Sequence, residues 1–476
     1  MFLRGICLCA ALAAIAPAAW AQAPAQIQVP GNPALDPLRK QADEAYRQRN
    51  FGLTMQLAEQ ILQQEPEDHV ALYLRGSARI EVGIATNAAE LIRLGIADSR
   101  EAIRHEGSGL PDYYLPYIYG MSYLTGMEGK KTHAQTARQV ADSVLEREDL
   151  ADDERANLLY QRAHAEVQLK DFPTAEADLQ QALQLDPNHE AAHMLQAEIA
   201  AKTKSPQEAV NAYSRVIQVF PQDPVVYNNR GMYLLGIKQY QYAVNDFTKA
   251  IELNPKFTEA HINRGFCLME AGDWKTAEGS LNSALAIEPN HTGALSLRGQ
   301  CRMQQGRTAE GLQDFNQIVQ AAPTSASSYA DLGFAQFFAG EYVGANMSFA
   351  KAMELDPNAR FLLPWRLAAE VRCGTITQEL YKASLTKAEA ERDWVDHIIL
   401  YQGGRIDETG LLAAVHPNDD AAKVAQTCEA YYFIGLEMTR RNRAADARGY
   451  FQRAAQSKVS KLSAYRGALL ALNTAN

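Results

Sequence analysis

Cysteine is scarce in this chain, which has six cysteines in 476 residues. Two of them, Cys7 and Cys9, lie in an apolar run close to the N-terminus. The others show no C-x-x-C spacing, and they are Cys267, Cys301, Cys373 and Cys428. So few cysteines exclude a disulfide-stapled scaffold, and their spacing gives no metal or redox motif.

Long apolar runs and an excess of basic residues are also missing. Beyond residue 21, no stretch approaches the roughly 18 uninterrupted apolar residues that a transmembrane helix needs. Lysine and arginine total 46 against 56 acidic residues, and the formal net charge is −10. Because an acidic chain without a basic stripe repels phosphate, we expect no nucleic-acid partner, and we expect no transmembrane segment.

Sequence signatures of catalysis and of cofactor binding are absent as well. The chain has no Walker A motif, no nucleophile elbow and no dinucleotide fingerprint. The longest non-repetitive stretch, residues 360–427, is shorter than the roughly 100 residues that a separate catalytic domain needs. We therefore expect no enzyme, no cofactor and no metal.

One motif favours the opposite interpretation. His189 and His193 match H-E-x-x-H, which on a continuous helix places two imidazoles one turn apart for zinc, with Glu190 as general base. Here the motif follows Pro187 closely, so the first histidine precedes or barely enters a helix, and a third ligand at suitable spacing is missing. A zinc peptidase is the less favoured alternative.

The N-terminus has the three parts of a secretory signal peptide. Arg4 supplies the basic start, residues 6–16 are apolar, and residues 19–21 (Ala-Trp-Ala) form a small-residue cleavage site. We expect residues 1–21 to be a signal peptide cleaved near Ala21, and the product to be periplasmic. Residues 22–36 are rich in proline and polar residues, and they predict a flexible leader.

After the leader, the chain repeats itself with a period of 34 residues, most clearly at 224–257. With Pro224 as position 1, this unit has a large residue at position 4, glycine at 8, leucine at 11, alanine at 20, phenylalanine at 24, alanine at 27 and proline at 32. The residues are Tyr227, Gly231, Leu234, Ala243, Phe247, Ala250 and Pro255. This pattern resembles the tetratricopeptide repeat (TPR), a helix-turn-helix unit.

The resemblance implies an all-α fold, a right-handed α-solenoid of stacked units, because one unit cannot bury its own apolar face. The chemistry of the pattern residues agrees with this. Gly231 has no Cβ, so the second helix can approach, and Ala243 is small on the facing side. Pro255 ends the unit because its nitrogen cannot donate a hydrogen bond.

The period is regular over six consecutive units, residues 156–359. A proline stands near the end of each unit, 34 residues after the last: Pro187, Pro221, Pro255, Pro289, Pro323 and Pro357. Before this block, residues 37–155 fit divergent units, the second of which is long over residues 83–104. We expect an inserted helical segment there, at 87–94.

After the regular block the pattern decays. Residues 360–427 keep helical segments, expected at 365–372, 377–391 and 394–401, but lose the glycine, alanine and proline positions. The pattern returns at Cys428, so residues 428–476 are predicted to form a final unit and a capping helix. We expect that helix at 461–472, where it covers the end of the solenoid.

This C-terminal part resembles the end of periplasmic TPR adaptor lipoproteins of Gram-negative bacteria. The residues are CEAYYFIGLEMTRRNRAADARGYFQRAAQ at 428–456 and SAYRGALLAL at 463–472. The resemblance implies a scaffold that brings a protease or a cell-wall hydrolase to its substrate. This chain differs in having no lipid-attachment box, since Cys7 and Cys9 lie inside the apolar run.

Arginine recurs at position 7, and in three units an aspartate stands at position 23. The pairs are Arg162/Asp178, Arg230/Asp246 and Arg298/Asp314. A ladder of arginines could bind an anionic ligand, but an aspartate in the same unit favours internal pairing.

We also expect Cys267 and Cys301 to stay unbridged, because equivalent positions on stacked helices lie about 8 to 10 Å apart. A bond between Cys373 and Cys428 is left open.

Positions 2, 5, 9, 12 and 13 of each first helix lie opposite the packed stripe and are expected to line the concave groove. Large apolar residues gather there: Met232, Phe266, Met269, Met303, Phe334, Phe337 and Phe338. We therefore predict a non-catalytic scaffold that binds a protein or peptide in this groove. Position 12 has an alternative role, packing on the next unit. An accessory subunit of an envelope assembly, secretion or polysaccharide-export complex is the alternative function.

Overall fold

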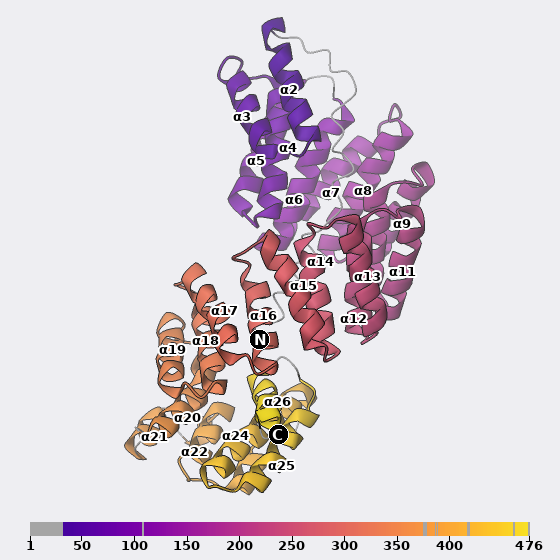
Figure 1. Cartoon of the computed structure of the whole chain (residues 1–476). Coiled ribbons are helices and arrows are strands. Elements are labelled where there is room, and N and C mark those ends of the chain that lie inside the picture. Colours follow the sequence, from indigo (N-terminus) through magenta and orange to yellow (C-terminus); the bar gives the residue numbers. More distant parts are fainter. Residues whose placement is uncertain are drawn as a thin grey trace. The chain divides into compact units, whose positions relative to one another are not determined.

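The computed structural model describes residues 32–106, 109–374, 378–385, 387, 389–416, 419–459 and 462–474. Every regular element in these ranges is a helix, and the helices follow one another as antiparallel pairs (Figure 1). The predicted all-α solenoid of TPR-like units is confirmed. The predicted signal peptide lies outside the described residues. The described chain forms two compact units, residues 32–253 and 254–474, here called the N-terminal unit and the C-terminal unit.

The N-terminal unit holds the divergent repeats and the first three regular ones. Its elements are η1 (Pro33–Leu35), α2 (Asp36–Arg47), α3 (Phe51–Leu62), α4 (His69–Ala85), α5 (Ala89–Glu106), η2 (Pro111–Tyr113), α6 (Tyr114–Glu128), α7 (Lys131–Leu145), α8 (Asp152–Leu169), α9 (Phe172–Leu185), α10 (Glu190–Thr203), α11 (Pro206–Val219), α12 (Pro224–Gly236) and α13 (Tyr240–Leu253).

The C-terminal unit holds three further regular repeats and the part where the pattern decays. Its elements are α14 (Thr258–Glu270), α15 (Trp274–Ile287), α16 (Thr292–Gln304), α17 (Thr308–Ala321), α18 (Ala326–Phe338), α19 (Tyr342–Leu355), η3 (Arg360–Leu362), α20 (Leu363–Cys373), α21 (Gln378–Ser384), η4 (Glu389–Glu391), α22 (Trp394–Gln402), α23 (Glu408–Ala413), α24 (Asp420–Arg440), α25 (Ala444–Gln456) and α26 (Ser463–Thr474).

Local sequence explains where the regular helices begin. Asp223 precedes α12, and its carboxylate accepts a hydrogen bond from the backbone N–H of Val225. Ser205 caps α11 in the same way and forms a capping box with Glu208. Such caps satisfy N–H groups that have no partner inside the helix. Helices α10, α12, α16 and α18 have such side-chain caps and begin at position 1 of their repeats. Helix α14 also begins at position 1, without a side-chain cap.

The four regular repeats with glycine at position 8 have a close contact between positions 8 and 24. A Cβ added at Gly231 would lie 2.8 Å from Cε1 of Phe247, and one added at Gly333 would lie 2.6 Å from Cδ1 of Phe349. Ordinary van der Waals contact begins at 3.4 Å, so the second helix of these repeats could not approach as closely if position 8 carried a side chain. The glycine pattern therefore sets the distance between the two helices.

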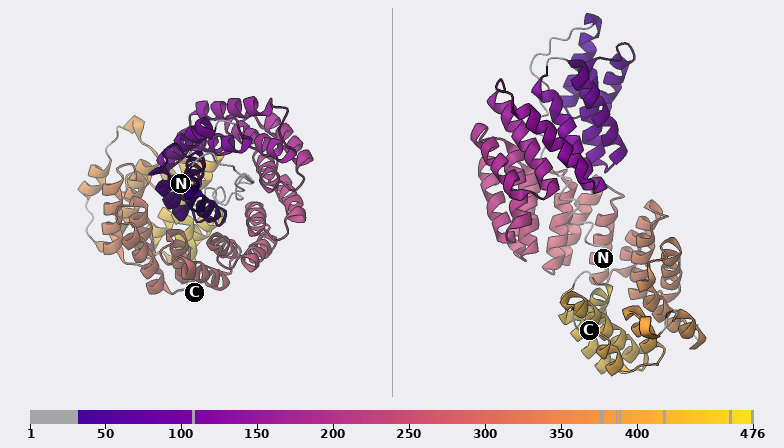
Figure 2. Two further views of the ribbon diagram at one scale, coloured as in Figure 1. Left: turned by 90° about the horizontal axis from the view of Figure 1, so that it is seen from above. Right: turned by 180° about the vertical axis from the view of Figure 1, so that it is seen from behind.

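The first helices of the pairs form the inner layer of the N-terminal unit. Helix α6 packs on α8, α2 on α4, and α8 also contacts α10. Second helices of neighbouring pairs make no comparable contacts within the described part of the unit. The inside of a curved stack is the more crowded side, so the first helices line the concave face. Figure 2 (left) shows the helices of this unit following that curve.

Three details of the prediction are wrong. The long stretch at 83–104 contains no separate inserted helix, because α5 runs unbroken from Ala89 to Glu106. In place of the single helix expected at 377–391, the structure has two short elements, α21 and η4. Helix α24 begins at Asp420 rather than at Cys428. Sequence analysis also missed α23, which Asp407 caps through the N–H of Gly410.

Among the described residues, no helix is both long and apolar enough to cross a membrane. The capping helix expected at 461–472 corresponds to α26, which packs against α25 and α24 (Figure 1). It also reaches α16 and α18, the first helices of two regular repeats. The contact with α18 concerns the predicted groove, because Phe334, Phe337 and Phe338 lie on that helix.

Candidate functional site

Three residues of the predicted apolar groove do not face a groove. Met269, Met303 and Phe337, all at position 12, are buried with exposed fractions of 8%, 6% and 4%. The cause is packing within the repeat stack: a Cβ added at Gly311 on α17 would lie 2.7 Å from Cγ of Met303. The prediction of open groove residues is wrong at these positions. Met303 packs on the second helix of its own repeat, and Phe337 shows the alternative role of packing on the next unit, with its ring 5.6 Å from that of Trp365 on α20.

Phe334 and Phe338 belong to an aromatic cluster rather than to an open surface. The ring of Trp365 lies 5.0 Å from that of Phe334 and 5.9 Å from that of Phe338 between ring centroids. Tyr432 completes the cluster, with its ring 5.2 Å from Trp365. These rings come from α18, α20 and α24, so the cluster joins the last regular repeat to the final one.

Helix α26 covers part of this cluster with its smallest residue. A Cβ added at Gly467 would lie 2.6 Å from Cε1 of Phe338 and 2.7 Å from the hydroxyl of Tyr432. Farther along the helix, Asn473 donates a hydrogen bond of 3.3 Å to Gln304 on α16. The chain's own C-terminal helix therefore occupies the surface that the groove prediction assigned to a partner. Phe266 is half-buried in the same unit, and Met232 is half-buried in the N-terminal unit.

The inner layer of the N-terminal unit contains a mostly buried group of polar and aromatic residues, in which Tyr123 is half-buried, His164 is 7% exposed and Gln161 is 0% exposed. On α6 and α8 the rings of Tyr123 and His164 stack, with centroids 4.9 Å apart and planes at 22°. Burial lowers the pKa of His164 to about 4, so its imidazole is neutral at pH 7. Its Nδ1 has no hydrogen-bond partner among the described residues. Both amide atoms of Gln161, one turn earlier on the helix, also lack a partner there.

The same stripe continues on the next two first helices. Position 9 is His164 on α8, Glu198 on α10 and Met232 on α12. Burial raises the pKa of the Glu198 carboxyl. At position 6, Asn229 on α12 corresponds to Gln161 and accepts a 3.5 Å hydrogen bond from Asn228. We call Tyr123, Gln161, His164, Glu198, Asn229 and Met232 the inner stripe.

Sequence reasoning missed most of the inner stripe because it selected apolar residues only. His164 and Glu198 stand at position 9, the same position that singled out Phe266 and Phe334. Position 9 lies on the concave side of the stack whether its residue is polar or apolar. The repeat position alone could therefore have predicted His164 and Glu198 as members of the inner stripe. Buried polar groups without partners are rare in folded proteins, which makes them the more informative members of the set.

The predicted arginine–aspartate pairs are present in all three repeats. Arg230 donates from Nε and Nη2 to the two carboxylate oxygens of Asp246, at 2.8 and 2.7 Å. Its Nη1 donates to the hydroxyl of Ser214 on the second helix of the preceding repeat, at 3.1 Å. Arg162 and Arg298 make equivalent pairs. These arginines tie neighbouring repeats together and do not form a ladder for an anionic ligand.

The H-E-x-x-H motif is used for helix capping. His189 precedes α10, and its Nδ1 accepts a hydrogen bond from the N–H of Ala192 at 3.2 Å. The Nε2 of His193 lies 2.9 Å from the carbonyl oxygen of Pro187. Because one histidine caps the helix and the other bonds to the preceding loop, the pair does not form the two-histidine face of a zinc peptidase. The described part of the chain has no group of three or more His, Cys, Asp or Glu that could hold a metal ion.

Comparison with known proteins identifies the repeated unit. Two family profiles, both described as tetratricopeptide repeat, match residues 160–224 and 234–301. These two regions are tetratricopeptide repeats. The first match contains Gln161, His164 and Glu198 of the inner stripe. No curated protein matches the chain.

Solved structures with a similar fold include other proteins of short helical repeats. PilW, described as a type IV pilus biogenesis factor, is 24% identical over 42% of this chain and 94% of its own, with a TM-score of 0.37. PilF of Pseudomonas aeruginosa is 19% identical over 44% and 95%, with a TM-score of 0.37. MamA of Desulfovibrio magneticus RS-1 is 23% identical over 36% and 96%, with a TM-score of 0.33.

The four cysteines of the TPR units and the C-terminal part are free thiols. The prediction that Cys267 and Cys301 stay unbridged is therefore confirmed. Cys373 and Cys428, for which a bond was left open, are unbonded too. Burial raises the pKa of the Cys267 and Cys428 thiols to about 11, so neither is a reactive thiolate at neutral pH.

Proposed function

We propose that this protein is an exported, non-catalytic scaffold that binds an extended segment of a protein partner along the inner stripe of its N-terminal unit. Its TPR units support a role in protein–protein interaction. The proposal adds a location and a mode of binding to that role. It also moves the binding surface from the aromatic residues of α18 to the first helices α6, α8, α10 and α12.

The observation that carries the proposal is the pair of unpartnered polar groups at Gln161 and His164. An enclosed polar group without a hydrogen bond costs about 1 to 3 kcal/mol. Folded proteins retain such a cost where a ligand or a functional role accounts for it. Gln161 has one acceptor and two donor hydrogens, and His164 adds a further nitrogen on the same helix, one turn away. Gln161 is 0% and His164 7% exposed, so a partner would reach these groups only when the side chains over them move aside.

An extended peptide is the ligand that fits this chemistry. Its backbone presents N–H donors and C=O acceptors in alternation, and each needs a partner when it leaves water. Gln161 and Asn229 stand at the same position of repeats two units apart, and the repeat between them has Leu195 there. The neighbouring ring of Tyr123 and the thioether of Met232 offer apolar contact for side chains of the peptide.

Export is the second part of the proposal, and it rests on the signal-peptide pattern at residues 1–21. A fusion of these residues to alkaline phosphatase, which is active only outside the cytoplasm, tests it directly. We expect phosphatase activity from the fusion and none when residues 6–16 are deleted. Equal activity without residues 6–16, or no activity in either fusion, would contradict export.

A photo-crosslinking experiment tests the binding surface. A benzophenone amino acid replaces the half-buried Met232 on α12 in one variant and the exposed Gln181 on α9 in a matched control. Irradiation in the cells that make the protein is followed by purification and mass spectrometry. We expect a partner polypeptide joined at position 232 and absent at position 181. The same adduct at both positions, or an adduct at 181 alone, would place the binding surface elsewhere.

The crosslinked partner also discriminates between the scaffold and the alternative function. A subunit of an envelope, secretion or polysaccharide-export complex would co-purify with the other subunits of that complex. A single partner that carries catalytic activity would instead favour an adaptor for an enzyme.

A further inference from the structure

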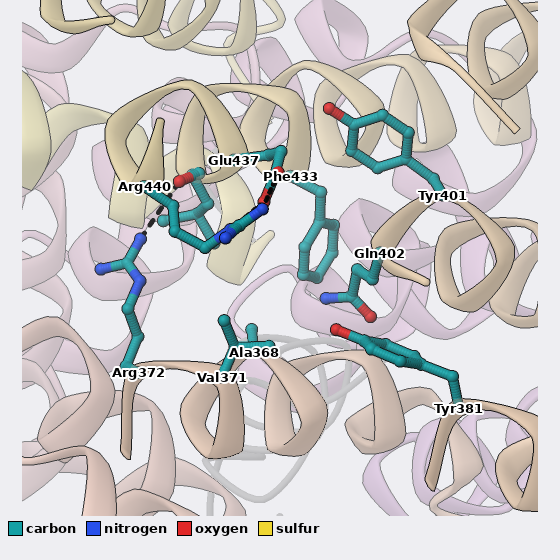
Figure 3. A pocket seen from close by; sticks show the side chains of 10 residues that line it. Ala368, Val371, Arg372, Tyr381, Tyr401, Gln402, Phe433, Glu437 and Arg440 are labelled. Carbon is teal, nitrogen blue, oxygen red and sulfur yellow. Dashed lines mark hydrogen bonds and ion pairs between the residues drawn. The ribbon is translucent and has the colours of Figure 1, made fainter. Parts of the chain in front are cut away.

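The C-terminal unit contains a pocket that lies outside the TPR matches. It has a volume of about 200 Å³, is open to solvent on one side, and is lined by residues of α20, α21, α22 and α24. Ala368, Val371, Phe433 and Leu436 supply apolar surface, and Tyr381, Tyr401 and Gln402 lie together on one side. Figure 3 shows Arg372 on the side opposite to them and Glu437 with Arg440 along a third side.

Hydrogen bonds between helices hold the walls of the pocket in place. The Nε2 of Gln402 on α22 donates to the carbonyl oxygen of Pro364 on α20, at 2.9 Å. The indole N–H of Trp394, also on α22, donates to the carboxylate of Glu429 on α24, at 2.6 Å. These two bonds fix α22 to α20 and to α24, the helices that supply most of the lining.

Arg372 stands in this wall without an acidic partner. Its guanidinium donates to the hydroxyl of Tyr342 at 2.9 Å and to the carbonyl oxygen of Leu436 at 3.2 Å, and both acceptors are neutral. Among the described residues, Arg372 forms no ion pair with a carboxylate. Arg162, Arg230 and Arg298 each pair with an aspartate. The positive charge of Arg372, by contrast, has no carboxylate of the described chain to neutralise it.

The one acidic residue of the lining does not supply this charge. Glu437 accepts hydrogen bonds from Arg440, at 2.5 and 2.7 Å, and from Arg441, at 2.8 Å. Its carboxylate is thus shared by two arginines of its own helix. The lining as a whole has more positive than negative charge, which favours an anionic ligand.

Two further polar groups in the lining have no partner among the residues that the structure describes. They are the hydroxyl of Tyr401, whose side chain is 4% exposed, and the Oε1 of Gln402. Both atoms are closed to water in this conformation. The Oε1 can only accept a hydrogen bond, so a turn of the Gln402 side chain toward the pocket would let it accept from an N–H or O–H donor on the ligand. The Tyr401 hydroxyl can donate or accept.

We propose that this pocket binds the carboxylate of an N-acylated amino acid with an aliphatic side chain, the chemistry of a peptide C-terminus. The carboxylate would pair with Arg372, the amide N–H would donate to Oε1 of Gln402, and the side chain would pack on Phe433. The volume suits one side chain of leucine size, since a cavity of about 150 Å³ holds a benzene molecule. The proposal does not depend on the inner stripe, because the pocket belongs to the C-terminal unit.

N-acetyl-leucine is the probe that tests this assignment, with calorimetry or ligand-observed NMR as the readout. A ligand of this size is expected to bind with a Kd of about 1 mM. N-acetyl-leucinamide, which lacks the negative charge, should bind at least about tenfold more weakly because charge-assisted hydrogen bonds are about twice as strong as neutral ones. Equal binding of acid and amide, or no binding of either, would overturn the proposal.

Variants separate the pocket from the rest of the surface. Arg372→Gln should reduce the affinity at least about tenfold, and Arg372→Lys should retain more of it, because the charge persists. Arg453→Gln is the matched control, since Arg453 lies 5.4 Å from the Tyr450 ring as Arg372 does from Tyr342, but away from the pocket. The control should bind as the wild type does. If circular dichroism shows that Arg372→Gln is unfolded, Val371→Phe, which fills the pocket, replaces it. Wild-type affinity in the variant that folds would refute the site.

A third comparison identifies the source of the ligand. A hexapeptide that ends in leucine with a free carboxylate is compared with N-acetyl-leucine. Tighter binding of the peptide would support a protein C-terminus as the natural ligand, and equal affinity would support a free amino-acid derivative. Equal binding of the hexapeptide and its C-terminally amidated form would contradict the carboxylate assignment in either case.

Discussion

The bridge from Arg230 to Asp246 gives the most quantitative prediction about stability. Asp246 is 6% exposed, and the two hydrogen bonds from Arg230 are the contacts that compensate its charge. Breaking a fully buried ion pair from one side costs about 3 to 5 kcal/mol. The Arg230 side chain is 23% exposed, so water screens part of this effect, and we expect Arg230→Ala to cost about 2 to 3 kcal/mol.

The double variant Arg230→Ala/Asp246→Ala serves as the control. Removing both partners leaves no buried charge, so the double variant should lose less stability than Arg230→Ala alone, with a coupling energy of at least about 1 kcal/mol. Arg264→Ala should also cost less, because Arg264 donates to the neutral hydroxyl of Ser280 on its own second helix, at 3.0 Å.

The assay combines urea unfolding, followed by circular dichroism, with hydrogen exchange of the segment 240–253. Repeat proteins unfold in parts, so local exchange reports the loss at α13 even if the global transition broadens. Equal losses for Arg230→Ala and Arg264→Ala, or a double variant that is less stable than Arg230→Ala, would refute the reasoning that the buried charge dominates.

Four further predictions concern packing, turns, pH and thiol reactivity. Gly333→Ala should cost about 1 to 3 kcal/mol by thermal unfolding, because the new methyl group meets the Phe349 ring at 2.6 Å; an unchanged melting temperature would contradict the position 8 to 24 contact. Lys238→Gly should stabilise by about 0.5 to 1 kcal/mol, since residue 238 has φ 62° in the inter-helix turn; a loss of stability would show that the lysine side chain matters more. Burial raises the pKa of Glu166 to about 8, so the folded state holds a proton that the unfolded state releases near pH 4.5, and stability should fall as pH rises from about 4.5 to about 8; Glu166→Gln should show a smaller fall, and an identical pH profile would exclude this carboxyl as the cause. Cys373 is the least buried of the four thiols and should react first with a thiol reagent under native conditions; faster labelling of another cysteine, found by peptide mapping, would contradict the packing described here.

The regular repeats could be predicted from the sequence because their neighbours recur with the same period. Gly231 and Phe247 belong to one 34-residue unit, and the structure brings them into contact as that pattern predicts. The arginine–aspartate pairs were predictable for the same reason. The hydrogen bond from Arg230 to Ser214 could not be predicted from the period, because it depends on how one repeat stacks on the preceding one.

The surroundings of Phe334 and Phe338 could not be predicted from the period. Their contacts come from Trp365 and from Tyr432, and Phe338 also meets Gly467 of the last helix. Those residues lie where the repeat pattern has decayed or ended, so position numbers say nothing about their place. A large apolar residue at a concave position was therefore taken for an open surface, although the chain itself covers it.

The pocket beside Arg372 is also beyond sequence reasoning. It is formed by α20, α21, α22 and α24, and two of these helices are shorter than ten residues. No motif links Tyr381 to Gln402 or to Phe433. Only the packing of these short helices against α24 brings them together.

The central claim is that the inner stripe of the N-terminal unit binds a partner, and Gln161→Leu tests it most directly. Leucine keeps the size of the side chain and removes its unpartnered amide, so the free protein should gain about 1 kcal/mol or more in stability. The measurement is the affinity for the partner found by crosslinking, taken together with the melting temperature. We predict that the variant melts at a higher temperature and binds the partner at least about tenfold more weakly. Unchanged affinity, whatever the melting temperature, would contradict the assignment of this surface to partner binding.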